Sequence, residues 1–320
     1  MIEEPFAHGD LVSVIIPVHN RAHLLERSVG SICTQSYDNL EILVIDDAST
    51  DDIDGAVRAL DDPRIRLIRR TQNGGVAAAR NDGMAAARGA LVAFNDSDDI
   101  CVFNRIERQV TCLCDQPGMI GVYSARIIYM QVSEQGYNRI HLTVRPRPHE
   151  RPLSGDLAAR TVENNIINFP AMMARRSALE RAGPCDVLLR NNVDWDQLLR
   201  LTREGPFAFI PEPLLYTPVP DIEEVSGDRI SQSNQLSMRS FTRISGKLRR
   251  DGHGGRALAG HYCTAASYLL RGRRSRFARR FLRAAMQLAP LSPRAWRLYA
   301  ISYTPGLYTR IRGLRRSMRR

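Results

Sequence analysis

The stretch that decides the fold is VSVIIPVHNRAHLLERSVGSICTQSYDNLEILVIDDASTDD, residues 12–52. Two apolar runs rich in β-branched residues, Val12–Val18 and Glu41–Asp46, flank residues 22–35, whose apolar positions recur at helical spacing. Parallel strands need a long crossover connection between them, and a helix is the usual one. The sequence therefore predicts an α/β fold that begins at Val12.

The same alternation continues along the chain. The patterns predict a weak helix over 52–60, a third strand over 65–68, an alanine-rich helix over 76–87 and a fourth strand over 91–94. Further strands are expected over 120–144, and helices near 156–163, 176–182, 194–203, 257–270, 275–288 and 293–301. A polar, proline-bearing segment, 218–237, reads as a mobile loop.

Acidic side chains follow two of these strands directly. Asp46 and Asp47 close the second strand, and Asp96, Asp98 and Asp99 follow the fourth. In open α/β sheets, ligands bind beyond the carboxyl ends of the strands. The sequence therefore predicts that both acidic groups lie along one edge of the sheet.

The length of 320 residues suits one large unit and a smaller one. We expect a catalytic domain over 1–220, a flexible linker or acceptor loop over 221–255, and an arginine-rich helical region over 256–320. Asp251 is the last acidic residue, and sixteen arginines follow it, in a chain whose net charge is +11. This one-sided excess indicates an anionic partner for the tail, such as a membrane surface, a nucleic acid or an acidic polymer.

Several common signals are missing from the sequence. The six cysteines have neither zinc-site spacing nor the density of a disulfide scaffold, and the acidic N-terminus does not resemble a secretory signal. No apolar run approaches the ~20 residues that span a bilayer. We therefore expect a cytoplasmic protein whose membrane contact, if it has one, is peripheral, at the inner face of the plasma membrane.

Three stretches in this order carry a resemblance to a known family: residues 12–52, NGGVAAARNDGMAAARGALVAFNDSDD (73–99) and VDWDQLLRL (193–201). Together they resemble family 2 glycosyltransferases, the inverting group with the GT-A fold, of the bacterial cell-surface polysaccharide type. The similarity runs from Val12 to Tyr216. It implies a Rossmann-like mixed sheet flanked by helices, here with a C-terminal α-helical extension.

The resemblance also implies an activity. Such an enzyme moves a sugar, a hexose in the expected case, from a nucleoside-diphosphate donor to a hydroxyl of a glycan or lipid-linked acceptor. A UDP-sugar is the expected donor, and a divalent metal, Mn²⁺ or Mg²⁺, the expected cofactor.

Asp96-Ser97-Asp98 forms a D-x-D turn of the kind that presents hard oxygen ligands to such a metal while leaving positions open for phosphates. The resemblance makes Asp98 the principal metal ligand. It places Asp96, a second ligand, against the donor sugar or ribose, counts Ser97 among the donor-binding residues, and has Asp99 support the turn. An acidic turn can also simply cap a helix.

The remaining donor contacts follow from the resemblance as well. It assigns Asp47 to the nucleobase and Pro17, His19 and Asn20 to the lining of the base pocket. His19 stands where the family usually has tyrosine, so His19 and Asn20 would equally suit a helix cap. Ser49 is expected to cap the next helix.

Arg80 lies one helical turn into the alanine-rich helix, after two glycines that allow close backbone approach. The resemblance places it near the base or the phosphates. The alternative is a surface arginine paired with Asp82 or another neighbour.

The V-D-W-D run resembles the family's E-D-W-D, which makes Asp194 the general base for the acceptor hydroxyl. Val193 departs from the usual glutamate. A second departure is Tyr216-Thr217-Pro218-Val219, where many relatives read Y-R-x-H with a histidine that helps to hold the metal or the diphosphate.

Other functions fit less well. A sugar nucleotidyltransferase would need a glycine-rich basic loop after the first strand, which residues 17–20 do not provide. A catalytically decayed nucleotide-sugar-binding or membrane-associated protein is the non-enzymatic alternative. For the tail, Phe277, Phe281 and Leu282 lie among arginines at helical spacing, which favours a membrane surface over a nucleic acid. The competing explanation is an apolar side packed on the catalytic domain.

Overall fold

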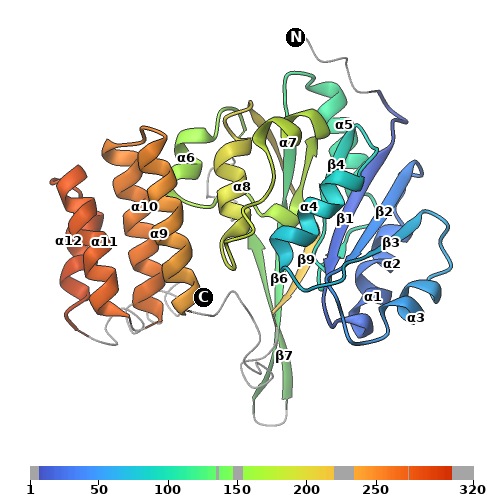
Figure 1. The fold of residues 1–320 in the computed structure, drawn as a ribbon, viewed down its shortest axis with the longest axis horizontal. Helices are drawn as coiled ribbons and strands as arrows, with labels where there is room; N and C mark the ends of the chain where they lie inside the picture. The colour runs from blue at the N-terminus through green and yellow to red at the C-terminus, as the bar shows by residue number, and fades with distance from the viewer. Residues whose placement is uncertain (1–6, 135–136, 147–153, 220–233, 273, 305–320) are drawn as a thin grey trace. The chain divides into compact units, whose positions relative to one another are not determined.

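A computed structural model describes residues 7–134, 137–146, 154–219, 234–272 and 274–304 (Figure 1). The residue contacts divide the chain into two compact units. Unit 1 comprises Met1–Leu157, Ile167–Leu188 and Asp196–Asp228. Unit 2 comprises Ala158–Ile166, Leu189–Trp195 and Arg229–Arg320.

Unit 1 is built on one nine-stranded mixed sheet. The strands lie in the order β3 (Ile65–Arg69), β2 (Leu40–Asp46), β1 (Val12–Val18), β4 (Leu91–Phe94), β8 (Met172–Arg175), β6 (Gly121–Glu134), β9 (Phe207–Val219) and β5 (Ile100–Cys101), and β7 (Tyr137–Arg145) pairs with β6. The first four strands in this order are parallel, whereas β8 is antiparallel to both of its neighbours. The predicted mixed α/β sheet is confirmed.

The core of unit 1 explains why the first strand reads as a continuous apolar run. Every residue of β1 is buried, because helices cover both faces of the sheet. Val14 and Ile16 belong to a cluster contributed also by α1 (Ala22–Ser28), α2 (Gly30–Cys33), α3 (Ile53–Arg58) and α5 (Arg105–Asp115). Burying each such side chain contributes about 1.5–3 kcal/mol.

On the other face, α4 (Val76–Ala86) packs against β1 and β2. Its Gly83 lies so close to the strand that an added Cβ would come within 2.5 Å of Ile15. A glycine is therefore needed at this position, and the small residues of the alanine-rich helix allow the helix to approach the sheet closely.

Unit 2 is helical. It contains α6 (Ala158–Glu163), α9 (Asn234–Arg250), α10 (Gly255–Arg271), α11 (Ser275–Leu288) and α12 (Pro293–Ile301). The other four helices all contact α10, which is buried along most of its length. The division between the units falls within α8 (Val193–Leu201), and α7 (Arg176–Ala182) and the 3₁₀ turn Phe169–Ala171 belong to unit 1.

The observed elements differ from the predicted ones in several places. The sequence patterns did not predict β5, α5, β8 or β9. The helix expected over 22–35 is two short helices, with Val29 between them. Residues 234–250, expected within a linker, form α9, because Phe241, Ile244 and Leu248 make a buried stripe at helical spacing. The rest of the expected loop, 220–233, lies outside the described residues. None of the described helices is both long and apolar enough to cross a bilayer.

Candidate functional site

The two acidic groups lie along the same edge of the sheet, as predicted. β1 runs parallel to β2 on one side and to β4 on the other, with Val18 opposite Asp46 and Ile15 opposite Phe94. The residues that follow β2 and β4 therefore leave the sheet at its carboxyl edge. Ligands bind at this edge in sheets of this type.

Asp47 is buried and organises the entrance to α4. Its carboxylate accepts hydrogen bonds from the backbone N–H groups of Gly74 (2.9 Å) and Gly75 (2.7 Å) and pairs with the guanidinium of Arg70. Gly75 has φ 80°, a conformation that glycine adopts without strain. Arg70 also pairs with Asp82 at 2.6 Å. Asp47 thus fixes the glycine turn that opens the helix carrying Arg80.

Asn20 links the ends of the first two strands. Its backbone N–H donates to Ser49 (2.9 Å), and its amide oxygen accepts from the N–H of Thr50 (2.7 Å). The expectation that Ser49 caps the next helix is wrong, because the cap of α3 is Asp52, which accepts from Gly55 at 2.8 Å. His19 is exposed beside Asn20, and its side chain lies 3.3 Å from the Asn20 amide.

Neither His19 nor Asn20 caps the helix that follows. Arg21 is the N-cap of α1 and makes no side-chain cap bond, and Asp51 accepts the N–H of Ala22 at 2.7 Å. Pro17 is buried in β1, one residue before its end. The loop that follows β1 is therefore held by the loop that follows β2, and the His19 ring remains exposed at the carboxyl edge of the sheet.

Each carboxylate of the D-x-D turn is held by an arginine. Arg80 donates to Asp96 at 3.0 Å, and Arg21 lies 3.2 Å from Asp98 and 3.3 Å from the Ser97 hydroxyl. Arg80 is buried, with its guanidinium 4.5 Å from the centre of the Phe169 ring. It is not a surface residue paired with Asp82, so the structure brings Arg80 and Asp96 together at one position.

Asp99 lies beneath the turn and is 2% exposed. Burial, together with the negative charges of Asp96 and Asp98, raises the pKa of its carboxyl well above the usual range. A hydrogen bond from Thr217 and the charge of Arg126 act in the opposite direction. A crowded group of carboxylates of this kind is favourable for a cation.

Thr217 stands where the Y-R-x-H pattern has its arginine. Arg126, from the neighbouring strand β6, donates to the Thr217 hydroxyl at 3.3 Å. The neighbouring strand therefore places a guanidinium group beside Thr217.

A buried arginine supports the same turn from the core side. Arg105 is fully buried and donates to the side-chain oxygen of Asn95 (3.2 Å) and to the carbonyls of Phe94 (2.9 Å) and Pro170 (2.6 Å). Asn95 in turn donates to the carbonyl of Asp96 at 3.0 Å. The turn is thus fixed by neighbours that do not themselves reach the edge.

The D-x-D turn also fits a divalent metal by the chemistry of its donors. Within the described ranges, no group of three or more histidine, cysteine, aspartate or glutamate side chains is already arranged around a metal position. Mg²⁺ in phosphate-transfer sites needs only one or two carboxylates, because substrate phosphates supply other ligands. Asp96 and Asp98, with side chains 38% and 21% exposed, meet that requirement.

The two aspartates of the D-W-D run have different surroundings. Asp196 is 2% exposed and pairs with Arg200 at 3.2 Å. Asp194 is half-buried in the first turn of α8, and its carboxylate accepts from the amide of Asn165 at 2.9 Å. Asp194 is therefore the aspartate that solvent or a substrate can reach. Val193 is buried, so the family's usual glutamate is replaced here by an apolar core contact.

Apart from Arg80, sequence reasoning missed the basic side chains of the site. Arg69 ends β3 and Arg70 follows it at the same edge, and Arg69 donates to the buried Asp46 at 2.9 Å. Because they come at the end of a predicted parallel strand, their position at the carboxyl edge could have been predicted from the sequence. Arg21 follows β1 in the same way. Arg126 gave no such signal, because its neighbourhood depends on pairing with a strand about 90 residues away.

Comparison with known proteins gives a consistent result. The model of the family described as Glycosyl transferase family 2 matches residues 13–183. The chain is 40% identical over 103 residues, 32% of its length and 41% of the relative's, to UDP-Glc:alpha-D-GlcNAc-diphosphoundecaprenol beta-1,3-glucosyltransferase WfgD of Escherichia coli. It is 37% identical over 99 residues, 31% of its length and 28% of the relative's, to succinoglycan biosynthesis protein ExoO of Rhizobium meliloti. These matches span less than half of either relative.

Solved structures share the fold over most of the chain. TarS 1–349 of S. aureus superposes with a TM-score of 0.59 at 15% identity, covering 91% of this chain and 88% of that one. The mannosyltransferase PcManGT of Pyrobaculum calidifontis, solved with GDP-Man and Mn²⁺, gives 0.58 at 22% identity, covering 95% and 82%. The predicted GT-A fold with a helical C-terminal region is confirmed.

Proposed function

Because the chain belongs to glycosyltransferase family 2, we propose that it transfers a sugar from a nucleoside-diphosphate donor to an acceptor hydroxyl with inversion at the anomeric carbon. The observation that carries the proposal is the D-x-D turn, where Asp96 and Asp98 each meet an arginine at the carboxyl edge of the sheet. A site with both carboxylates and guanidinium groups can accept a cation and a diphosphate together.

In this proposal Pro17, His19 and Asp47 line the base and ribose end of the donor, and Arg80 with Ser97 lies near its phosphates. Asp96 and Asp98 would hold a divalent cation, Mn²⁺ or Mg²⁺, which when bound neutralises the diphosphate leaving group. Binding of the donor would draw Arg21 and Arg80 from the carboxylates toward the phosphates. UDP is the nucleotide that we propose to test first, because the similar E. coli protein is named for a UDP-Glc donor.

Asp194 acts as the base. Its carboxylate accepts the proton of the acceptor hydroxyl as that oxygen forms a bond to the anomeric carbon. The bond between this carbon and the diphosphate oxygen breaks at the same time, and the nucleoside diphosphate leaves with the electron pair. A single displacement of this kind inverts the configuration. The half-exposed position of Asp194 and its hydrogen bond from Asn165 suit this role.

We propose a lipid-linked acceptor in surface-polysaccharide synthesis, at the inner face of the plasma membrane. Two observations support this choice: the name of the similar E. coli protein includes a diphosphoundecaprenol acceptor, and the tail carries sixteen arginines. In this proposal the tail does not bind nucleic acid.

The test of the proposed base is Asp194→Asn. We expect donor binding, measured by calorimetry with UDP, to remain at the parental level, while sugar transfer falls by about a hundredfold or more. Asp196→Asn is the matched control. It should lower the melting temperature, because it weakens the buried pair with Arg200. Near-parental turnover in Asp194→Asn, or retained anomeric configuration in fresh product read by proton NMR, would overturn the mechanism.

A further inference from the structure

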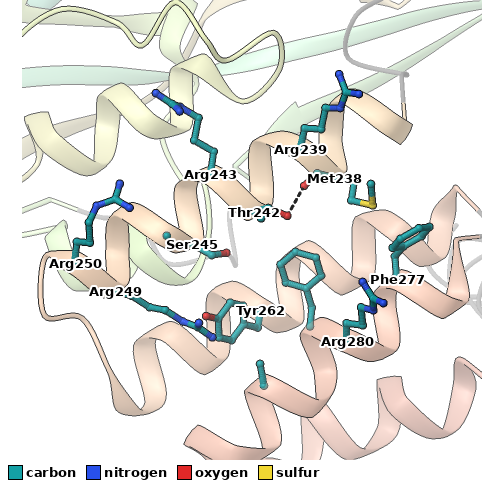
Figure 2. Close-up of a pocket in the computed structure, with 13 residues that line it drawn as sticks. Met238, Arg239, Thr242, Arg243, Ser245, Arg249, Arg250, Tyr262, Phe277 and Arg280 are labelled. Carbon is teal, nitrogen blue, oxygen red and sulfur yellow. Dashed lines mark hydrogen bonds between the residues drawn. The ribbon is translucent and has the colours of Figure 1, made fainter.

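A basic groove lies in unit 2, outside the donor site. It has a volume of about 800 Å³ and is formed by α9 and α11, with Tyr262 of α10 between them (Figure 2). Five of its thirteen lining residues are arginines, and none is acidic. Ligand pockets for small molecules have volumes of this order. The charge of the lining selects an anionic ligand.

The two walls place charge beside aromatic rings. Arg249, from α9, lies 5.5 Å from the centre of the Tyr262 ring, and Arg280, from α11, lies 5.9 Å from that of Phe277. Figure 2 shows Arg249 reaching toward Tyr262, and Arg280 lying beside Phe277. Phe277 and Phe281 are half-buried, so the groove offers apolar surface next to its guanidinium groups.

Tyr262 supplies an independent sign of a ligand. The residue is 2% exposed, and its buried hydroxyl has no hydrogen-bond partner among the described residues. A buried hydroxyl without a partner destabilises the folded state, because it has lost its hydrogen bonds to water. Arg249 lies against this ring, so an anion that binds Arg249 would come close to the hydroxyl and could accept its hydrogen bond.

The groove and the proposed base belong to the same compact unit. Trp195, next to Asp194 in the chain, packs 4.9 Å from the His261 ring, and His261 lies 3.1 Å from the hydroxyl of Ser245, which lines the groove. The base and the groove are therefore joined by directly packed side chains. A molecule bound in the groove would therefore lie in the same unit as Asp194, the proposed base.

From these observations we propose that the groove between α9 and α11 binds the acceptor through a diphosphate attached to an apolar chain. Arg249, Arg280 and the Tyr262 hydroxyl bind the diphosphate, and Phe277 and Phe281 contact the first part of the chain. This inference rests on the proposed function, since it assigns the acceptor's lipid diphosphate to unit 2. A concave, single-ligand site of this volume favours such a molecule over a flat membrane surface or a nucleic acid strand.

Calorimetry on the full chain tests the inference with farnesyl diphosphate as a soluble probe, in buffer already saturated with UDP and Mn²⁺. We expect farnesyl diphosphate to bind at least about tenfold more tightly than inorganic diphosphate, and farnesol to bind weakly. The double variant Arg249→Gln/Arg280→Gln should lose about tenfold or more in affinity for farnesyl diphosphate. Arg256→Gln/Arg297→Gln removes the same charge from exposed positions outside the groove lining and should bind like the parent.

The variant Tyr262→Phe tests whether the Tyr262 hydroxyl contacts the ligand or only stabilises the fold. Removing an unpartnered buried hydroxyl should leave the melting temperature unchanged or raise it, while farnesyl diphosphate binding weakens about threefold or more. A fall in stability with unchanged binding would contradict the role of the hydroxyl.

Three results would overturn the inference. Farnesyl diphosphate could bind no better than inorganic diphosphate, the two double variants could lose affinity equally, or farnesyl diphosphate could bind only when UDP is left out of the buffer. Phosphatidylglycerol vesicles test the alternative that the tail binds a membrane surface. This alternative would be supported if farnesyl diphosphate does not inhibit binding to the vesicles and if both double variants weaken that binding equally. Failure of the proposed function has a different signature: UDP binding or sugar transfer would be absent while farnesyl diphosphate still binds.

Discussion

At the scale of single residues, the site is a set of aspartates, each already bound by the chain itself. Asp47 holds two backbone N–H groups and Arg70, while Asp96 and Asp98 hold Arg80 and Arg21. Their exposure separates their roles. Asp47 is buried and shapes the loop, whereas Asp96 and Asp98 remain partly exposed, as the proposed exchange of an arginine for a substrate requires.

Asp47→Ala should therefore affect stability as well as donor binding. The substitution leaves the N–H groups of Gly74 and Gly75 without their acceptor and removes the partner of Arg70. We expect the free energy of unfolding to fall by about 2–3 kcal/mol, together with a loss of UDP affinity. Urea denaturation and calorimetry measure the two effects. Parental stability with weaker UDP binding would mean that Asp47 serves the donor alone.

Arg126 gives a second prediction at this scale. Arg126→Gln removes the positive charge near Asp99 and Thr217, so the crowded carboxylates of the turn should repel each other more strongly. The more negative turn should repel the diphosphate, so binding of UDP without metal should weaken several-fold, whereas binding of UDP with Mn²⁺, which offsets the negative charge, should change less. Arg108→Gln, at an exposed pair with Glu212, is the control. Equal behaviour of the two variants would show that Arg126 does not replace the charge missing at Thr217.

At the scale of elements, unit 2 centres on a buried histidine. His261 contacts Trp195, Phe241, Tyr262 and Ser245, none of which carries a charge. Burial lowers the pKa of the imidazole from its ordinary value of 6.5 to about 4. The unfolded chain therefore binds a proton before the folded one does. Above pH 6.5 the free energy of unfolding does not depend on His261, because the imidazole is neutral in both states. As the pH falls from 6.5 to about 4, only the unfolded chain binds the proton, so the free energy of unfolding falls.

This loss amounts to about 3 kcal/mol over that interval. Urea denaturation at a series of pH values measures it, read by the fluorescence of Trp195 in a Trp296→Phe background, since these are the chain's two tryptophans. His261→Gln should flatten the dependence between pH 6.5 and 4. An unchanged pH profile in that variant would show that other groups cause the acid sensitivity of unit 2.

Sequence patterns predicted most elements of unit 1, because short parallel strands and amphipathic helices carry their own periodicity. They also located the acidic edge, since it depends only on where each strand ends. α9 was harder to predict, because basic and polar residues surround the buried stripe of Phe241, Ile244 and Leu248. The sequence can indicate arginines at this edge, as it did for Arg80, but it does not show which aspartate each arginine binds, because these pairs join segments that are distant in sequence.

At the scale of the whole molecule, the residues proposed for donor binding and those proposed for the acceptor belong to different units. The residues proposed for the donor all belong to unit 1, whereas Asp194 and the basic groove belong to unit 2. The helix that carries Asp194 continues from one unit into the other. In this account, binding of the donor and binding of the acceptor can be abolished separately by substitutions in different units.

The most direct test of this account is calorimetric titration of UDP into the parent chain, with Mn²⁺ and with a chelator, alongside Asp98→Ala. The control, Asp115→Ala, removes an exposed carboxylate at the end of α5. We predict that Mn²⁺ strengthens UDP binding at least about tenfold in the parent and the control, and has no effect in Asp98→Ala. Equal UDP affinity with and without metal in all three proteins, or no UDP binding in the parent, would contradict the account.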